Sequence, residues 1–113
     1  MKHKMLSPLL DFVFKDLFGD VRRIINVEIQ AASFPELTKR FVLYSAKLLT
    51  GQIKKGGDYR DIEPVVSIII LNDTLVPDDK NYYNTYRIRN VETGVELTGV
   101  LEINLLELSK LPP

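Results

Sequence analysis

The feature that most constrains the fold is a run of apolar, mostly β-branched residues from Val65 to Leu71, which follows Pro64 and is interrupted only by Ser67. An apolar run without alternation predicts a strand that is buried on both faces, at the centre of a sheet. Such a strand needs neighbours on both sides and cover above and below, so the rest of the chain must supply strands and helices. The run is far too short to cross a bilayer, and we expect no membrane association.

The segment before this run has the pattern of a strand followed by a helix. Arg23–Gln30 alternates apolar residues with Asn26, Glu28 and Gln30, which predicts a strand with one apolar and one polar face. Ser33-Phe34-Pro35-Glu36 matches a capping box, with Ser33 as N-cap, and predicts a helix to about Thr50. Its expected buried stripe comprises Leu37, Phe41, Tyr44, Leu48 and Leu49. Together these elements predict a right-handed βαβ unit with two adjacent parallel strands.

The ends of the chain complete a small α+β domain, which we expect to span residues 1–113. A helix is predicted from Ser7, as N-cap, to Gly19. After the central strand, Pro77-Asp78 predicts a turn, because proline favours the first corner of a turn. Tyr82–Arg89 alternates and predicts an outer strand, and Thr93-Gly94 predicts a turn. Val100–Leu108 predicts a last strand, which either forms a hairpin with the outer strand or closes a sheet edge.

Composition narrows the chemistry that is available. Fifteen Lys and Arg balance fifteen Asp and Glu among the 113 residues, which excludes a generally basic nucleic-acid surface but leaves a local basic patch open. The absence of cysteine excludes a thiolate nucleophile or metal site. We expect a cytoplasmic protein, because the charged N-terminus leads into no long apolar region and no run could cross a bilayer, and the absence of cysteine fits this. The single histidine, His3, excludes a histidine cluster for zinc. Any catalysis must therefore use carboxylates, amides, Lys, Arg, Tyr or hydroxyls.

The polar face of the first strand is the leading site candidate. Glu28 and Gln30 point the same way, about 6.6–6.8 Å apart along the strand, so they can bind a hard divalent ion and orient a water. The alternative interpretation is an ordinary solvated strand face. Arg40 and Tyr44 lie four residues apart on the predicted helix and share a face, where they could contact phosphate. Their alternative roles are a surface arginine and a core tyrosine.

Other charged residues are weaker candidates. Asp11, on the first predicted helix, fits an exposed carboxylate favoured by the helix dipole. Lys54, Lys55, Arg87 and Arg89 could contact a DNA backbone, or they could be scattered solvated charges.

Several stretches, in order, resemble a known family. Leu6–Gly19 (Leu-Ser-Pro-Leu-Leu-Asp-Phe-Val-Phe-Lys-Asp-Leu-Phe-Gly) resembles the opening of the Rpn-type, or transposase, branch of the PD-(D/E)XK nucleases. Ile25–Gln30 resembles its Glu-x-Gln motif, in which Gln replaces the more usual Lys. Arg40–Leu48 resembles the helix after that motif. Gly56-Gly57-Asp58-Tyr59 and Pro64–Leu71 resemble the segment that follows.

The resemblance implies a restriction-endonuclease-like fold, with a small mixed sheet flanked by helices. It implies Mg²⁺-dependent cleavage of DNA linked to recombination. Glu28 and Gln30 would be the catalytic pair, with Glu28 as a metal ligand beside Asp20 or Asp11. Arg40 and Tyr44 would contact the substrate.

The sequence departs from the family pattern in one place. Family members carry a longer segment, including the metal-binding Asp, between the first helix and the Glu-x-Gln strand. Here seven residues separate Asp20 from Glu28, too few for two paired strands and their turn. We therefore expect weak or absent cleavage, with a non-catalytic oligomeric interaction module, or an unrelated α+β binding domain, as the alternatives. Because the truncated core leaves a sheet edge and an apolar helix face uncovered, we also expect a homodimer or a swapped oligomer.

Overall fold

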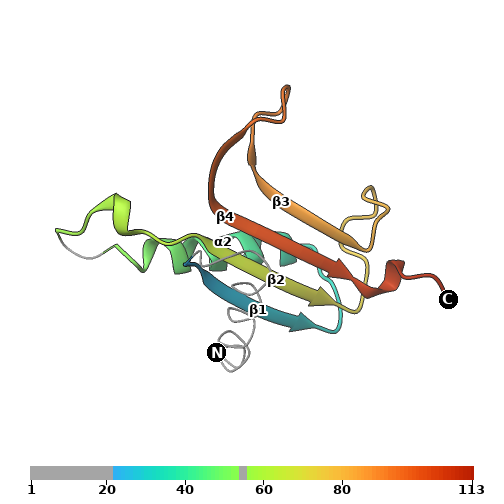
Figure 1. Cartoon of the computed structure of the whole chain (residues 1–113). Helices are drawn as coiled ribbons and strands as arrows, with labels where there is room; N and C mark the ends of the chain where they lie inside the picture. The colour runs from blue at the N-terminus through green and yellow to red at the C-terminus, as the bar shows by residue number, and fades with distance from the viewer. Residues whose placement is uncertain (1–21, 54–55) are drawn as a thin grey trace.

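The computed structural model describes residues 22–53 and 56–113. A four-stranded mixed sheet carries one helix, which gives the expected α+β class and is consistent with a restriction-endonuclease-like fold (Figure 1). The elements are β1 (Ile24–Gln30), α2 (Leu37–Thr50), β2 (Val65–Leu71), β3 (Tyr83–Arg89) and β4 (Glu96–Glu107), with short 3₁₀ turns at Tyr59–Asp61 and Leu108–Lys110. No helix within these ranges is long and apolar enough to span a membrane. The helix expected from Ser7 to Gly19 lies outside the described residues.

The βαβ unit is confirmed. Strands β1 and β2 are parallel neighbours, with Glu28 opposite Ile69, and α2 lies between them in the chain. The sheet order β1-β2-β4-β3 gives β2 a hydrogen-bonded neighbour on each side, and its Val65, Ile69 and Leu71 are completely buried. The apolar run therefore forms an interior strand, as its lack of alternation predicts.

The predicted hairpin is also confirmed, although its second strand is longer than expected. Strand β3 pairs antiparallel with β4, and β4 runs parallel to β2. Strand β4 begins at Glu96 rather than Val100, because β3 and β4 stay paired as far as Arg89 and Glu96. The register shifts on both sides of Ile88, where the hairpin turns away from the sheet (Figure 1).

Helix α2 covers one face of the sheet and forms the core with it. The buried cluster comprises Leu37, Phe41, Ile69, Leu71 and Leu105. Of the expected helical stripe, Leu37 and Phe41 are buried, whereas Tyr44, Leu48 and Leu49 are half-buried. Ser45 is buried instead, and its Oγ lies 2.6 Å from that of Ser67 on β2. This hydroxyl pair explains why a serine interrupts the apolar run.

The capping box predicted for α2 is wrong. The N-cap residue is Glu36, and no side chain caps the helix. Ser33 donates hydrogen bonds from its backbone N and from its Oγ to one carboxylate oxygen of Asp73, at 2.8 and 2.9 Å. Asp73 lies just after β2, forty residues along the chain from Ser33. The Ser33 hydroxyl, which the local pattern assigned to the cap of α2, therefore binds a distant carboxylate instead.

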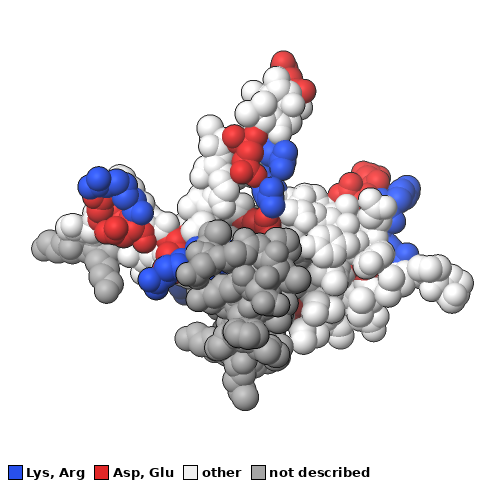
Figure 2. All heavy atoms as spheres, viewed as in Figure 1, with Lys and Arg blue, Asp and Glu red and all other residues white. Residues whose placement is uncertain are grey.

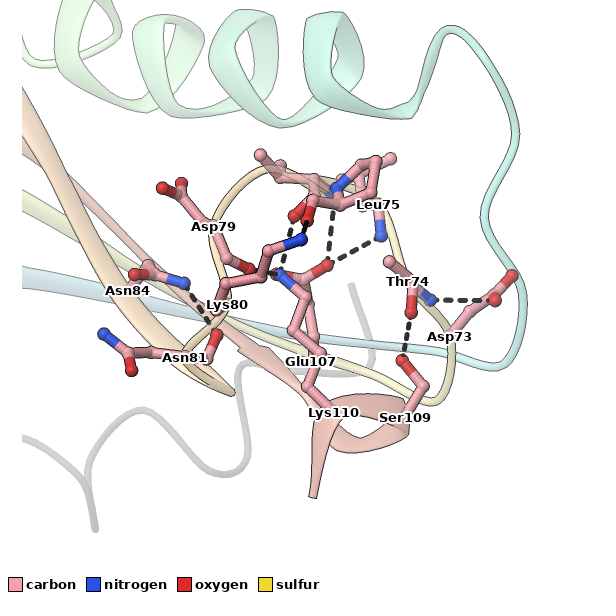
Figure 3. Close-up of polar contacts among 12 residues, drawn as sticks. Asp73, Thr74, Leu75, Asp79, Lys80, Asn81, Asn84, Glu107, Ser109 and Lys110 are labelled. Carbon is pink, nitrogen blue, oxygen red and sulfur yellow. Dashed lines mark hydrogen bonds and ion pairs between the residues drawn. The ribbon is translucent and has the colours of Figure 1, made fainter. Parts of the chain in front are cut away.

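A buried ion pair holds the loop between β2 and β3 (Figure 3). Glu107, which is completely buried, accepts hydrogen bonds at its Oε2 from the backbone N–H groups of Leu75 (2.7 Å) and Val76 (3.0 Å). Its Oε1 lies 2.6 Å from the Nζ of Lys110, which also donates to the carbonyls of Val76 and Asp79. The predicted Pro77-Asp78 turn is confirmed within this loop, where the N–H of Asp79 donates to the carbonyl of Val76.

Candidate functional site

The polar face of β1 lies beneath α2 rather than in solvent. Asn26 and Glu28 are buried, and Glu28 is only 1% exposed; on the apolar face Ile25 and Val27 are buried as well, and Ile29 is 55% exposed. The register explains this arrangement, because Asn26 and Glu28 stand opposite Ser67 and Ile69, whose side chains pack toward α2. The interpretation of this face as an ordinary solvated surface is therefore wrong for Glu28.

Glu28 is a buried carboxylate with incomplete hydrogen bonding. Its Oε1 accepts from the Nη2 of Arg40 at 3.4 Å. Its Oε2 is buried and has no hydrogen-bond partner among the described residues. A buried charged oxygen without a partner costs free energy, so it suggests a group that is retained for chemistry rather than for stability.

Two side chains of α2 act on this carboxylate. The side chain of Arg40 is about half exposed, so its guanidinium touches both Glu28 and solvent. Burial raises the pKa of Tyr44, and the negative charge of Glu28 raises it further, so the phenol stays protonated at neutral pH. The structure thus brings together Glu28, Arg40 and Tyr44, which the sequence nominated separately. Their roles in catalysis and substrate binding stay predictions.

Gln30 stands two residues beyond Glu28 on the same face of β1. It is half-buried, and its backbone carbonyl accepts from the N–H of Asn72 at 2.9 Å. The last residue of β1 is therefore an amide, on the face that carries Glu28. Asn26 adds a second amide on the same face, two residues before Glu28.

The described residues supply only part of a divalent metal site. They contain no group of three or more Asp, Glu, His or Cys side chains placed to hold an ion. The partnerless Oε2 of Glu28 fits one hard oxygen ligand, and the amides of Asn26 and Gln30 add neutral oxygens to the same face. Mg²⁺ normally takes one or two carboxylates together with phosphate oxygens. The two residues predicted to supply the second carboxylate, Asp11 and Asp20, lie outside the described ranges.

The basic residues proposed for DNA contact are already engaged with acidic ones. Arg87 pairs with Glu102, at 2.6 Å from its Nε, and with Glu96. Arg89 lies 3.8 Å from Glu96 and donates to the carbonyl of Gly94. These contacts brace the β3–β4 hairpin, which the alternation of Tyr82–Arg89 could not reveal. Lys54 and Lys55 lie outside the described residues.

Comparison with known proteins gives one finding. Residues 20–112 match the family described as PD-(D/E)XK nuclease family transposase. The matched span carries Glu28, Gln30, Arg40 and Tyr44, on β1 and α2. No curated protein and no solved structure matches the chain.

Proposed function

Because the chain belongs to the PD-(D/E)XK nuclease family of transposases, we propose that it acts on DNA and that its metal-dependent phosphodiester hydrolysis is weak. The observation that carries this proposal is the state of Glu28. One oxygen of this buried carboxylate faces Arg40, and the other has no partner among the described residues. The free oxygen is therefore suited to bind a metal ion. The same site, within the described residues, lacks the further carboxylates of a strong divalent site.

The proposed roles combine the family resemblance with the positions of the described side chains. Glu28 would hold Mg²⁺ together with Asp20 or Asp11, and the bound ion would polarise the scissile phosphate and activate water. Arg40, half exposed above Glu28, would donate to a phosphate oxygen of the DNA backbone. The amide of Gln30 would orient the attacking water, and the protonated phenol of Tyr44 would donate a hydrogen bond to the substrate.

Three features of this arrangement weaken hydrolysis. Gln30 carries no charge, so it cannot stabilise the negative charge that develops on the phosphate as a lysine there would. Arg40 brings a positive charge to the site, but that charge faces Glu28, which reduces the attraction of the carboxylate for a cation. Mg²⁺ also dehydrates reluctantly and needs further anionic ligands. Asp20 can hardly reach Glu28 to supply one, because only seven residues separate the two.

Two assays test the proposal. Fluorescence anisotropy with a labelled DNA duplex should show micromolar, salt-dependent binding, which Arg40→Glu weakens by about tenfold or more. The matched charge change Lys80→Glu, on the β2–β3 loop, should leave binding within about twofold of wild type. In a plasmid-nicking assay with Mg²⁺ or Mn²⁺, slow nicking should disappear in Glu28→Gln.

The outcomes separate the parts of the proposal. Absence of DNA binding by the wild-type chain would overturn the proposal that it acts on DNA. Rapid nicking that Glu28→Gln abolishes would show that hydrolysis is not weakened. Nicking of equal rate in both proteins would remove Glu28 from the catalytic role.

The second candidate function is a non-catalytic oligomeric interaction module derived from the same family. The Arg40–Glu28 ion pair favours it, because a guanidinium beside the carboxylate supplies a counter-charge without any metal. This candidate predicts self-association with neither DNA binding nor nicking. A cytoplasmic location stays a prediction.

A further inference from the structure

The distal part of the β3–β4 hairpin, residues 88–98, forms an arm that projects from the sheet (Figure 1). Register shifts on both sides of Ile88 mark the place where the arm departs. Its turn is well defined: the N–H of Asn90 donates to Val95, and that of Gly94 donates back to Asn90, at 2.8 and 2.9 Å. Gly94 has a φ of 75°, which glycine adopts without strain. The arm is therefore a hairpin whose turn is held by backbone hydrogen bonds.

The arm exposes aliphatic side chains. Val91 is 99% exposed and Leu97 is 80% exposed, and Val95 and Ile88 are also exposed. Figure 2 shows the arm as largely uncharged, with acidic atoms at its tip and opposite charges gathered near its base. The turn at the tip, residues 91–93, contains Glu92. Exposed aliphatic residues that gather on a projecting element mark an interaction surface.

A groove beside α2 offers the complementary surface. It lies between α2, the β2–β3 loop and strands β3 and β4, with a volume of about 220 Å³. The lining residues are Thr38, Phe41, Val42, Leu75, Val76, Tyr86, Ile103 and Leu105. The apolar surface continues along α2 over Val42 and Leu43, both exposed, and Lys39 stands beside them. The groove has room for a valine or leucine side chain and presents a cation at its rim.

We propose that the arm of one copy of this chain inserts Val91 into the α2 groove of a second copy, reciprocally, across a two-fold axis. The arm bends away from the sheet after Arg87, whereas Tyr86 of the same strand lines the groove, so a copy cannot fold its arm back into its own groove. A second copy meets no such restriction.

Charge complementarity supports a second copy as the occupant. Glu92 follows Val91 at the tip of the arm, and Lys39 stands at the rim of the groove. Within the described part of the chain neither side chain takes part in an ion pair. Insertion of Val91 brings Glu92 of one copy toward Lys39 of the other, and the two-fold axis repeats this contact.

Sedimentation velocity on the full chain, at micromolar concentrations, tests the proposal. The wild-type chain should be dimeric, and Val91→Asp and Val42→Asp should each raise the dimer dissociation constant by about tenfold or more. Both residues are exposed, so the folded monomer should tolerate the change, which far-UV circular dichroism checks. The matched control is Tyr59→Asp, at an 81% exposed residue outside the arm and the groove, which should leave the dimer unchanged.

A charge exchange tests the pairing itself. Lys39→Glu and Glu92→Lys should each weaken the dimer, and the double variant should restore it. A wild-type chain that stays monomeric overturns the proposal, as do Asp variants that dimerise like wild type, or a double variant without rescue. These measurements report mass and not DNA binding or cleavage, so their failure leaves the proposed activity on DNA untouched.

Discussion

Replacement of Glu107 by alanine should cause a large loss of stability. The substitution removes the acceptor for the N–H groups of Leu75 and Val76 and the counter-charge of Lys110. An unsatisfied buried N–H costs about 1–3 kcal/mol, and breaking a buried ion pair costs about 3–5 kcal/mol. Because Lys110 keeps two carbonyl acceptors and the loop can admit water, these costs overlap, and we expect a total of about 3–5 kcal/mol.

Glu107→Gln separates the charge from the hydrogen bonds. Glutamine keeps an oxygen that can accept from the two N–H groups but gives Lys110 no negative partner, so we expect a loss of about 1.5–3 kcal/mol. The control is Glu36→Gln, at an exposed residue whose side chain makes no capping bond, with an expected change within about 0.5 kcal/mol. Urea denaturation followed by far-UV circular dichroism measures all three differences. Values within about 0.5 kcal/mol of wild type for both Glu107 variants would refute the argument.

The same pair predicts a dependence on pH. Burial alone would raise the pKa of Glu107, but the hydrogen bonds from Lys110 and from the N–H groups of Val76 and Leu75 outweigh it and hold the pKa below its ordinary value. A carboxyl with a lowered pKa stabilises the fold above its unfolded pKa of about 4.3, and this contribution fades as pH falls through the folded pKa. The advantage of wild type over Glu107→Gln should therefore shrink below about pH 4. An advantage that stays constant to lower pH would contradict the assignment.

Two smaller substitutions test local features of the fold by the same denaturation measurement. Ser67→Ala removes the buried contact with Ser45 but leaves the Ser45 hydroxyl bonded to the carbonyl of Phe41. The free energy of unfolding should therefore fall by only about 0.5–1.5 kcal/mol. A larger fall would mean that the hydroxyl pair matters more than this geometry implies. Gly94→Ala places a Cβ at a φ of 75° and should cost about 1–2 kcal/mol, although no atom lies within 4 Å of the added carbon; an unchanged stability would show that the arm relaxes without strain.

The periodicity of the sequence was sufficient to predict the order and type of the described elements. The unbroken run Val65–Leu71 predicted the interior strand, and the alternation in Arg23–Gln30 predicted its parallel neighbour. These patterns can be read locally, because a strand that is buried on both faces is apolar along most of its length. The Glu-x-Gln strand and its spacing from the following helix also carried the resemblance to the nuclease family, which the match over residues 20–112 confirms.

Only the tertiary structure decided how the two faces of β1 are covered. Alternation distinguishes a polar from an apolar face but does not say whether the polar one is buried too. Here Ile25 and Val27 are buried on the apolar face, and Glu28 is buried on the polar face against Arg40. The capping prediction failed for a related reason, since Asp73 binds Ser33 from a distant part of the chain. Contacts between residues far apart in sequence leave no periodic trace, so the environment of Glu28, the Glu107–Lys110 pair and the departure of the arm all depended on the folded chain.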